Sequence, residues 1–415
     1  MRRVAIVGVG ITPRNRAAIS QQDRKSWKEY VADAAYDAIA DVTKGLNPRD
    51  IQYVVVNYHG EATMEAGGIG PVVSDVLGMH PVGVTQLCAN CTGAGVSAHE
   101  AYALVASGLY DRVLVIGFDK WWDLINPRDK VAIGGDVDYD FNFGFEHQQL
   151  QNILQAIYNK KYGIRTVLEA LVTYRIQMYW YANRNPNAAL YGIPCPIKSK
   201  KELMDIWERE PGSGEINPEF WRKLPGDPGL QDGASAFILV PAQEARSYTD
   251  KPIYIDGVAY KCNSHLLSKQ MYYPVPDLAK FDAGDFAACH LAVEEAYRMA
   301  KVKADDIDFA ELFESHITSL APTLHATQVP PEGKVIQFVI DGETAIDGRL
   351  PTGTDGGRRG FGRTSGSNES DGLYEAVVQM RGEAGERQVP KADVCVVVGM
   401  QGEMASSAAL VLRRE

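Results

Sequence analysis

The chain has 415 residues, of which 45% are hydrophobic and 23% charged, and its formal net charge is -11. The acidic balance argues against nucleic acid as a default partner, and no apolar run approaches the about 20 residues of a membrane span. Six cysteines in a chain of this length do not form a disulfide framework. We therefore expect a cytoplasmic protein whose thiols are reduced.

Apolar periodicity predicts alternating strands and helices in the first part of the chain. In chain order the predicted elements are a strand at residues 4–10, a helix at 25–41, a strand at 51–56, a helix at 96–108 and a strand at 112–117. The glycines after the first strand do not complete a dinucleotide-binding G-x-G-x-x-G motif, because position 13 is proline. A nucleotide site at this place is therefore only a minor alternative.

A second series of predicted elements repeats the first. It consists of a strand at residues 251–258, a helix at 286–301, a strand at 307–312, a glycine-rich turn at 356–366, a helix at 371–381 and a last strand at 394–398. Each series is typical of a βαβαβ unit. We therefore predict an α/β fold made of two similar halves that are stacked on each other.

An insert separates the predicted halves. We assign residues 1–120 and 231–250 to the N-terminal half, 121–230 to an inserted loop region, and 251–415 to the C-terminal half. The insert contains a helical stretch at 148–182 and an aromatic cluster formed by Tyr174, Tyr179, Trp180, Tyr181 and Tyr191. Because it is too long for a simple crossover, we expect a lid or a layer that contacts a partner. The aromatic cluster is expected to pack in the core or in a dimer.

Cys91 lies where a tight turn enters the predicted helix at residues 96–108. Backbone N–H groups at a helix N-terminus stabilise a thiolate, which predicts a nucleophilic cysteine. We expect Gly93 and Gly95 to leave room for a substrate near the backbone, and Cys88 to pack beneath the turn. The two cysteines form a C-x-x-C sequence, but no second such pair completes a zinc site, so we expect no metal.

Several other polar residues are predicted to lie near Cys91. Ligands of open α/β sheets lie beyond the carboxyl ends of the strands, and related halves should present equivalent segments to one place. His59 follows a strand of the first half, and His316 follows the corresponding strand of the second. Arg363 belongs to the segment that corresponds to the turn of Cys91. A thiol with such neighbours is suited to acyl transfer through a thioester.

Motifs along essentially the whole chain resemble those of the thiolase superfamily. They are Cys91-Thr92-Gly93 with residues 100–108, the segment 304–308, Thr354-Asp355-Gly356-Gly357, the segment 379–385 and the terminal residues 408–414. The Tyr58-His59-Gly60-Glu61 segment and the Asn90-Cys91-Thr92 setting are most similar to sterol-carrier-protein-type thiolases, in particular to their phloroglucinol-acetyltransferase-like branch.

The resemblance implies a five-layered αβαβα fold, a homodimer or a dimer of dimers, and cleavage or formation of a C–C bond by Claisen chemistry. It implies coenzyme A and acyl-CoA as substrates, with no tightly bound cofactor. Relatives of this kind often work with a small zinc-ribbon/OB-fold partner subunit, which we expect here as well.

The chain departs from the thiolase pattern at positions that handle protons. Gly362-Arg363-Thr364 replaces the usual Gly-His-Pro, Phe313 replaces an asparagine or histidine, and residues 399–403 replace a Cys-x-Gly loop. Arginine stays protonated and cannot serve as the base, although it can stabilise a thiolate or bind a carboxylate. The candidates for proton transfer are His316, His59, His147, Glu314 and Glu403.

The remaining site predictions concern coenzyme A and the oxyanion. We expect backbone N–H groups near Gly402, or a histidine, to stabilise the oxyanion, and Ser365 and Gly366 to contact coenzyme A. Arg358 and Arg359 are expected to face solvent or a partner. Arg363 and the aromatic insert favour an acyl-CoA that carries an aryl ketone and a free carboxylate. The best candidate is benzoylsuccinyl-CoA, from aromatic degradation, cleaved with coenzyme A to benzoyl-CoA and succinyl-CoA.

Three alternatives stay open at this point. The missing Gly-His-Pro motif favours a non-catalytic scaffold or binding subunit of a multi-subunit complex. An aldolase-type relative, in which the cysteine is dispensable, is the second alternative. The third is a Claisen-type or aldol-type acyltransferase that acts on another aromatic substrate.

Overall fold

The structure of the chain is a computed structural model. It describes residues 1–14, 25–60, 68–123, 138–139, 147–209, 224, 226, 228–266, 286–401 and 404–415. For residues 147–150 it describes the backbone alone. The described strands form one nine-stranded sheet in the order β3-β2-β4-β5-β1-β6-β9-β8-β7.

The N-terminal half contributes five of these strands and the helices beside them. Their bounds are β1 (Val4–Ile11), α1 (Trp27–Ala40), β2 (Tyr53–Tyr58), α3 (Gly70–Leu77), β3 (Gly83–Cys88), α4 (Gly93–Ser107), β4 (Val113–Asp119), β5 (Gly233–Pro241) and α10 (Ala242–Tyr248). The predicted elements of this half are confirmed to within a few residues. α1 begins after Ser26, whose N–H donates to the Glu29 carboxylate (2.7 Å), while its hydroxyl accepts the N–H of Glu29 (3.4 Å).

The strand β3 was not predicted from the sequence because it forms the edge of the sheet. It pairs only with β2 among the described strands, in parallel, and its residues are half-buried or exposed. A strand with no fully buried face lacks the alternation on which sequence-based prediction depends. Cys88, at its end, is exposed, so the expectation that Cys88 packs beneath the turn is wrong.

The helices of the insert lie against the C-terminal half. They are α6 (His147–Tyr162), α7 (Ile164–Arg184) and α8 (Lys200–Arg209). The single helical stretch predicted at residues 148–182 is therefore wrong in one respect. The chain breaks at Gly163, whose φ of +85° belongs to the left-handed region that glycine tolerates. The predicted boundaries of the insert stay a prediction.

The C-terminal half repeats the arrangement of the first. Its elements are β6 (Ile253–Cys262), α12 (Ala287–Ala300), β7 (Phe309–Leu312), α13 (Ile317–Ala326), α14 (Val335–Ile340), α15 (Gly357–Gly360), α16 (Asn368–Arg381), β8 (Val394–Met400) and β9 (Ser406–Arg413). The prediction that the last strand ends near residue 398 is wrong, because β9 follows and runs antiparallel to both β8 and β6.

The two halves share one sheet because their first strands are hydrogen-bonded. β1 and β6 pair antiparallel from Val4 opposite Ile255 to Ile6 opposite Ile253. On one side the order is β3-β2-β4-β5-β1, and on the other β7-β8-β9-β6 follows the same connectivity. The predicted repeat is therefore confirmed, and the two halves of the sheet are continuous through β1 and β6.

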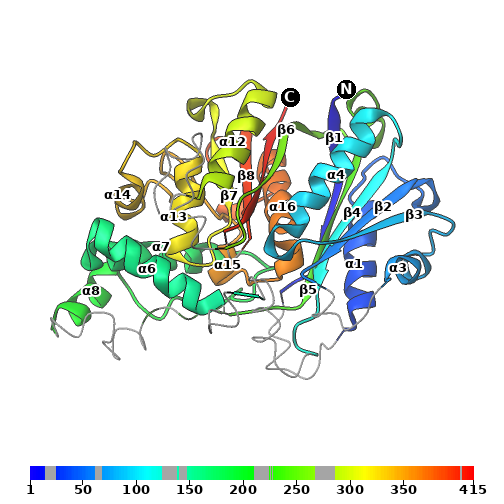
Figure 1. Cartoon of the computed structure of the whole chain (residues 1–415). Coiled ribbons are helices and arrows are strands. Elements are labelled where there is room, and N and C mark those ends of the chain that lie inside the picture. Colours follow the sequence, from blue (N-terminus) through cyan, green and yellow to red (C-terminus); the bar gives the residue numbers. More distant parts are fainter. Residues whose placement is uncertain are drawn as a thin grey trace.

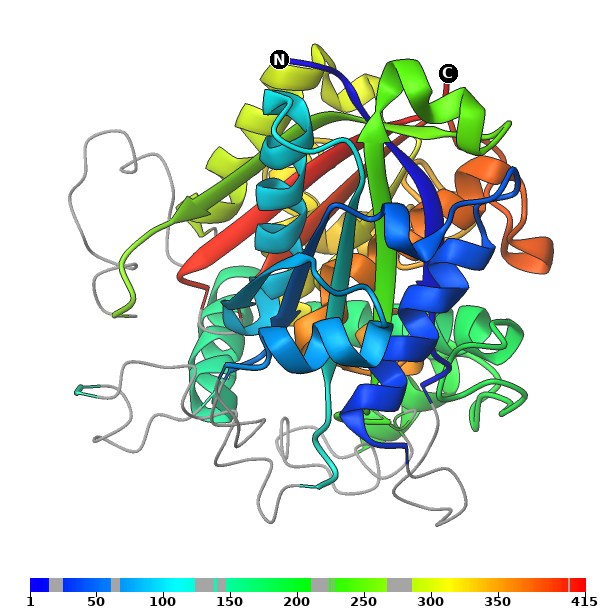
Figure 2. The same ribbon diagram turned by 90° about the vertical axis from the view of Figure 1, so that its right-hand side faces the viewer.

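Helices α4 and α16 lie between the two halves of the sheet. They contact each other and strands of both halves, and they share an apolar cluster that includes Ala98, Val105, Leu373 and Val377. α1 and α3 cover the outer face of the N-terminal strands, and α12 and α13 cover that of the C-terminal strands (Figure 1 and Figure 2). These elements form the five layers αβαβα. Within the described ranges, no helix combines the length and apolar composition needed to cross a membrane.

Candidate functional site

Cys91 lies in a single helical turn between β3 and α4. The turn, Asn90–Thr92, holds the half-buried thiol at the N-terminus of α4. The hydroxyl of Thr92 donates to the carbonyl oxygen of Ala89 (2.9 Å) and lies 3.1 Å from the hydroxyl of Ser406 on β9. These contacts hold the turn against the C-terminal half, at a place where the helix N-terminus favours negative charge.

Apolar side chains pack against Cys91 from the insert and the C-terminal half. This set, which we call the apolar wall, consists of Leu154, Phe286, Phe313, Met400 and Met404, and Ile157 packs against it as Cys91 does. Sites that bind small molecules are lined mainly by such side chains, with a few polar groups to fix orientation. An acyl group on the thiol would therefore have an apolar surface to lie against.

The glycines of the Cys91 turn make room for protein side chains and not for a substrate. A Cβ on Gly93 would lie 2.6 Å from Nδ2 of Asn57. A Cβ on Gly95 would overlap the Cβ of Ala408. The expectation that both glycines open space for a substrate is therefore wrong. They allow α4 to approach β2 and β9 closely.

Two buried polar residues join the two halves of the site. Asp119, at the end of β4, accepts the N–H of His59 (3.0 Å) and the N–H of Gly366 (2.5 Å) with its two carboxylate oxygens. Asn57 on β2 donates from Nδ2 to the carbonyl oxygen of Gly366, and its Oδ1 accepts the hydroxyl of Ser97 on α4 (3.1 Å). We call Asn57, Asp119 and Gly366 the Gly366 joint.

The joint holds the segment after Arg363 against the strand ends of the first half. A Cβ on Gly366 would overlap the carbonyl oxygen of Phe118 and lie 2.8 Å from the Cα of Tyr58. Glycine is therefore required for this approach. Burial raises the pKa of Asp119 to about 7, although the N–H groups of His59 and Gly366 favour its ionised form. The carboxyl group of Asp119 in the joint therefore changes its charge close to neutral pH.

The residues expected to contact coenzyme A are occupied by or buried in the joint. Both backbone polar groups of Gly366 are used inside the protein, and Ser365 is buried. Their contacts with coenzyme A stay a prediction. Gly402, the expected oxyanion donor, and Glu403 lie outside the described residues.

His59 is brought beside the turn of Cys91 through the backbone. The N–H of Asn90 donates to the carbonyl oxygen of His59 (3.1 Å). The imidazole is buried, and its ring centroid lies 5.1 Å from that of Trp121 in an edge-on contact. The position of His59 is thus fixed by Asp119 on one side and by the turn of Cys91 on the other.

Arg363 is half-buried and lies two residues before the turn Ser365–Ser367. Its N–H donates to the carbonyl oxygen of Gly229 (3.2 Å), and its carbonyl oxygen accepts the N–H of Gln231 (2.8 Å). The turn Ser365–Ser367 packs against the turn of Cys91. The structure therefore brings the arginine-bearing segment and the turn of Cys91 to the same end of the sheet.

His316 lies at the start of α13, beyond the end of β7. Its Nδ1 is 3.2 Å from the hydroxyl of Ser315, and its N–H donates to the hydroxyl of Ser319 (2.9 Å). It follows Phe313 of the apolar wall by three residues, so it lies at the end of the C-terminal half that faces Cys91. For His147 only the backbone, which begins α6, is described.

The expectation that Arg358 faces solvent or a partner is wrong. Arg358 is buried, with Nη2 2.7 Å from the Asp355 carboxylate and Nη1 3.3 Å from that of Asp371. Burial alone would lower the pKa of Arg358, but Asp355, Glu314 and Asp371 raise it. Glu314 accepts the N–H of Arg358 (2.6 Å), and burial raises the pKa of Glu314 to about 7. Glu314 thus points into this network, while Arg359 is half-buried.

Sequence reasoning missed Asn57 and Asp119. Each is a polar residue at the end of an otherwise apolar strand, and both are fully buried. Such residues usually have a specific hydrogen-bonding partner, and this signal could have selected them. Their partner, Gly366, is more than 240 residues from either of them along the chain, which no local pattern indicates.

Comparisons with known proteins agree with this architecture. A family model described as "Thiolase C-terminal domain-like" matches residues 278–414. An acetyl-CoA acetyltransferase of Methanothermobacter thermautotrophicus is 26% identical over 415 residues, which cover 100% of each chain.

Two solved structures also share the fold. One is that of an aldolase, "Ltp2-ChsH2(DUF35) aldolase", and it has a TM-score of 0.78 at 20% identity and covers 99% of this chain and 98% of its own. The other is a monomeric SCP2-thiolase like protein from Mycobacterium smegmatis. It has a TM-score of 0.68 at 18% identity and covers 99% of this chain and 77% of its own.

Proposed function

We propose that this chain, which belongs to the thiolase superfamily and is an enzyme of the thiolase and acyltransferase class, works through a thioester on Cys91. One observation carries the proposal. The thiol is half-buried at the N-terminus of α4 and packs against the apolar wall. A helix N-terminus stabilises a thiolate, and an acyl group on the thiol would lie against the apolar wall.

The proposed reaction cleaves a β-keto acyl-CoA in two steps. The Cys91 thiolate attacks the keto carbon, and the C–C bond breaks to give an acyl thioester on Cys91 and the enolate of the shorter acyl-CoA, which takes up a proton. The thiol of a second coenzyme A then loses its proton, attacks this thioester and releases the thiolate of Cys91. His316, His59 and His147 are the proposed candidates for the proton transfers.

The proposed substrate is benzoylsuccinyl-CoA. Phe286 and Phe313 of the apolar wall support an aryl group on the acyl side. Arg363 supports a free carboxylate, because its guanidinium stays charged and offers a forked set of donors. The products would be benzoyl-CoA, whose benzoyl group is first held as the thioester on Cys91, and succinyl-CoA.

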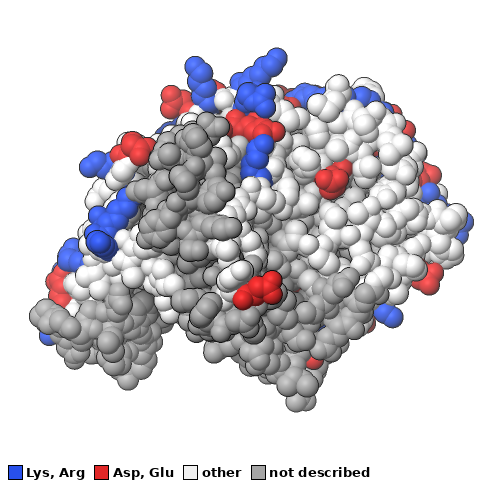
Figure 3. All heavy atoms as spheres, in the orientation of Figure 1, with Lys and Arg blue, Asp and Glu red and all other residues white. Residues whose placement is uncertain are grey.

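We further propose a homodimer and a small zinc-ribbon/OB-fold partner. The edge strand β3 carries no charged residue and is half-buried or exposed throughout, and few charged side chains lie over α4 and β3 (Figure 3). An uncharged edge strand is suited to pairing with another chain. The similar aldolase structure carries a DUF35 component in its name, which supports the proposal of a partner subunit.

A second candidate function is an aldolase that does not need the cysteine. The TM-score of 0.78 with the solved aldolase favours it. Such an enzyme would cleave a β-hydroxy acyl-CoA without a covalent intermediate, with a proton taken from the substrate hydroxyl.

The two candidates differ in what Cys91→Ser does. We expect the substitution to abolish cleavage of benzoylsuccinyl-CoA and of acetoacetyl-CoA by coenzyme A, and we expect Cys88→Ser, at the exposed neighbouring cysteine, to retain it. Full turnover by Cys91→Ser would favour the aldolase. Absence of turnover by the unmodified chain, even with its partner, would favour a scaffold. Cleavage of acetoacetyl-CoA alone would reject the aryl substrate.

A further inference from the structure

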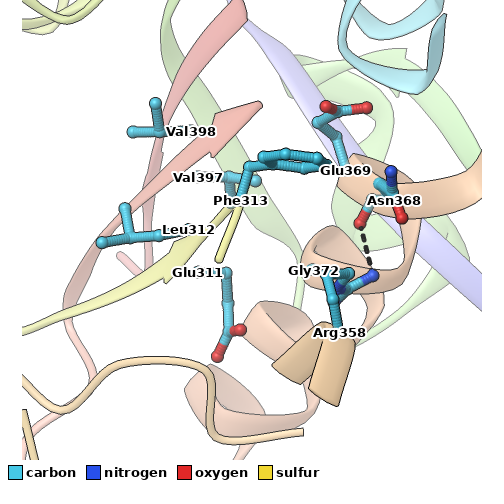
Figure 4. Close-up of a pocket in the computed structure, with 9 residues that line it drawn as sticks. All are labelled: Glu311, Leu312, Phe313, Arg358, Asn368, Glu369, Gly372, Val397 and Val398. Atoms are coloured by element: carbon cyan, nitrogen blue, oxygen red, sulfur yellow. Dashed lines mark hydrogen bonds between the residues drawn. The ribbon is translucent and has the colours of Figure 1, made fainter. Parts of the chain in front are cut away.

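A small cavity lies inside the C-terminal half, behind Phe313. It has a volume of about 10 Å³ and is bounded by residues of β7, β8, α15 and α16 (Figure 4). Phe313 belongs both to the lining of this cavity and to the apolar wall around Cys91. The cavity is therefore separated from the surroundings of the proposed nucleophile by one side chain.

Glu369, in the first turn of α16, connects this cavity to the helix of Cys91. The residue is 3% exposed, and its Oε2 accepts the N–H of Gly95 in the first turn of α4 (3.2 Å). A Cβ on Gly399 would overlap Oε1 of Glu369. The carboxyl group fits at this place because β8 has a glycine there.

Two buried acceptor atoms beside the cavity have no hydrogen-bond partner among the described residues. They are Oε1 of Glu369 and Oδ1 of Asn368, and both residues line the cavity at the start of α16 (Figure 4). Buried polar atoms are almost always paired with protein or with water. A volume of about 10 Å³ is close to the smallest that holds one water molecule.

We propose that one water molecule occupies this cavity and joins Glu369 to Asn368, and that Glu369, as a neutral acid, is a positioning residue for the Cys91 thiol. The acid proton on Oε1 is donated to the water, and the water donates to Oδ1 of Asn368, so both buried acceptors are satisfied. A neutral Glu369 adds no negative charge at the N-terminus of α4, where the thiolate of Cys91 forms. An ionised Glu369 would oppose that thiolate.

Several charged and titratable groups face Glu369 from the surrounding elements. They are Arg358 on α15, Glu311 on β7, Asp371 on α16 itself and Tyr260 on β6. Burial raises the pKa of Glu369 to about 8, which its own backbone N–H, the N–H of Gly95 and the charge of Arg358 only partly offset. The residue is therefore neutral below about pH 8 and charged above it.

The inference rests on the proposed role of Cys91, but its test does not need turnover. The rate of alkylation of Cys91 by iodoacetamide is measured across the neutral and alkaline range, with peptide mass spectrometry to follow Cys91 alone. Glu369→Gln stays neutral at every pH. We expect it to match the unmodified protein near pH 7 and to react faster at alkaline pH, by a factor on the order of three to ten.

Glu375→Gln is the matched control, because Glu375 is also buried on α16 but bonds to Arg387 and Thr354. It should keep the profile of the unmodified protein. The same profile for Glu369→Gln would overturn the proposal, as would a high-resolution crystal structure of the unmodified chain with an empty cavity, which needs no variant. Turnover that survives Cys91→Ser would reject the proposed function but would leave the alkylation profile unchanged, so the two failures are distinguishable.

Discussion

The substitution Asp119→Asn tests the Gly366 joint. Both carboxylate oxygens of Asp119 accept a backbone N–H, one from His59 at 3.0 Å and one from Gly366 at 2.5 Å. An asparagine side chain keeps one acceptor and directs its amide N–H₂ at the other N–H group. One buried donor therefore loses its acceptor and faces another donor.

The expected size of the effect follows from that single loss. A hydrogen bond to a charged group contributes about 1.5–3 kcal/mol, and every ~1.4 kcal/mol is a factor of ten in an equilibrium. The equilibrium between the intact joint and one in which the Gly366 segment has separated from Asp119 should therefore shift against the intact joint by about tenfold to a hundredfold. Because the intact joint holds His59 and the Arg363 segment beside the Cys91 turn, kcat/KM for thiolysis should fall by a similar factor.

The assay compares kcat/KM at a pH above 7, where Asp119 is ionised, together with thermal unfolding to show that each variant is folded. Asp308→Asn is the control. Asp308 also accepts two backbone N–H groups, those of Asp393 and Val394 at 2.9 Å each, but it lies at the amino ends of the C-terminal strands. A folded Asp119→Asn variant with kcat/KM unchanged, like the control, would refute the reasoning.

Gly366→Ala should lower the free energy of unfolding by about 2 kcal/mol or more, because its Cβ would overlap the carbonyl oxygen of Phe118. Gly60→Ala, with no described atom within 4 Å of its Cβ, should change it little, and equal losses in denaturant titrations would contradict the requirement for glycine. Arg363→Gln should raise KM about tenfold for a carboxylate-bearing acyl-CoA and much less for acetoacetyl-CoA; steady-state kinetics with equal increases would reject the carboxylate contact. Burial raises the pKa of Asp119 from 3.8 to about 7, so the folded state binds the extra proton between these values. Stability should therefore fall as pH rises from about 4 to about 7, by on the order of 4 kcal/mol. Asp119→Asn should lack this contribution. The measurement is the free energy of unfolding from denaturant titrations at about pH 4 and about pH 7. An equal change between the two pH values for the unmodified protein and the variant would contradict the prediction.

The repeated halves were predictable because their strands are buried and apolar. The runs at Val4–Ile11 and Val394–Met400 are buried along their whole length, and such runs stand out in a sequence. The edge strand β3 gave no such signal, since its residues alternate neither in polarity nor in burial. The break at Gly163 was not predicted because helix-forming residues flank this glycine on both sides.

The contacts of the candidate site were only partly predictable. The position of Cys91 before a helix is a local feature, and the sequence was enough to predict it. The burial of Arg358 depends on Asp355, Glu314 and Asp371, which meet only in the fold. Likewise, Gly93 and Gly95 are small because Asn57 and Ala408 approach them from distant strands. The close approach of distant strands explains these glycines, whereas the sequence alone led to the expectation that they leave room for a substrate.

The central claim is that Cys91 carries the acyl group. The most direct measurement mixes the protein, with any partner, with a β-keto acyl-CoA in the absence of free coenzyme A, quenches in acid, and locates the added mass by peptide mass spectrometry. We predict one acyl group on the peptide that contains Cys91, lost on addition of coenzyme A, retained in Cys88→Ser and absent in Cys91→Ser. Turnover without any such adduct, or an adduct that persists in Cys91→Ser, would contradict the claim.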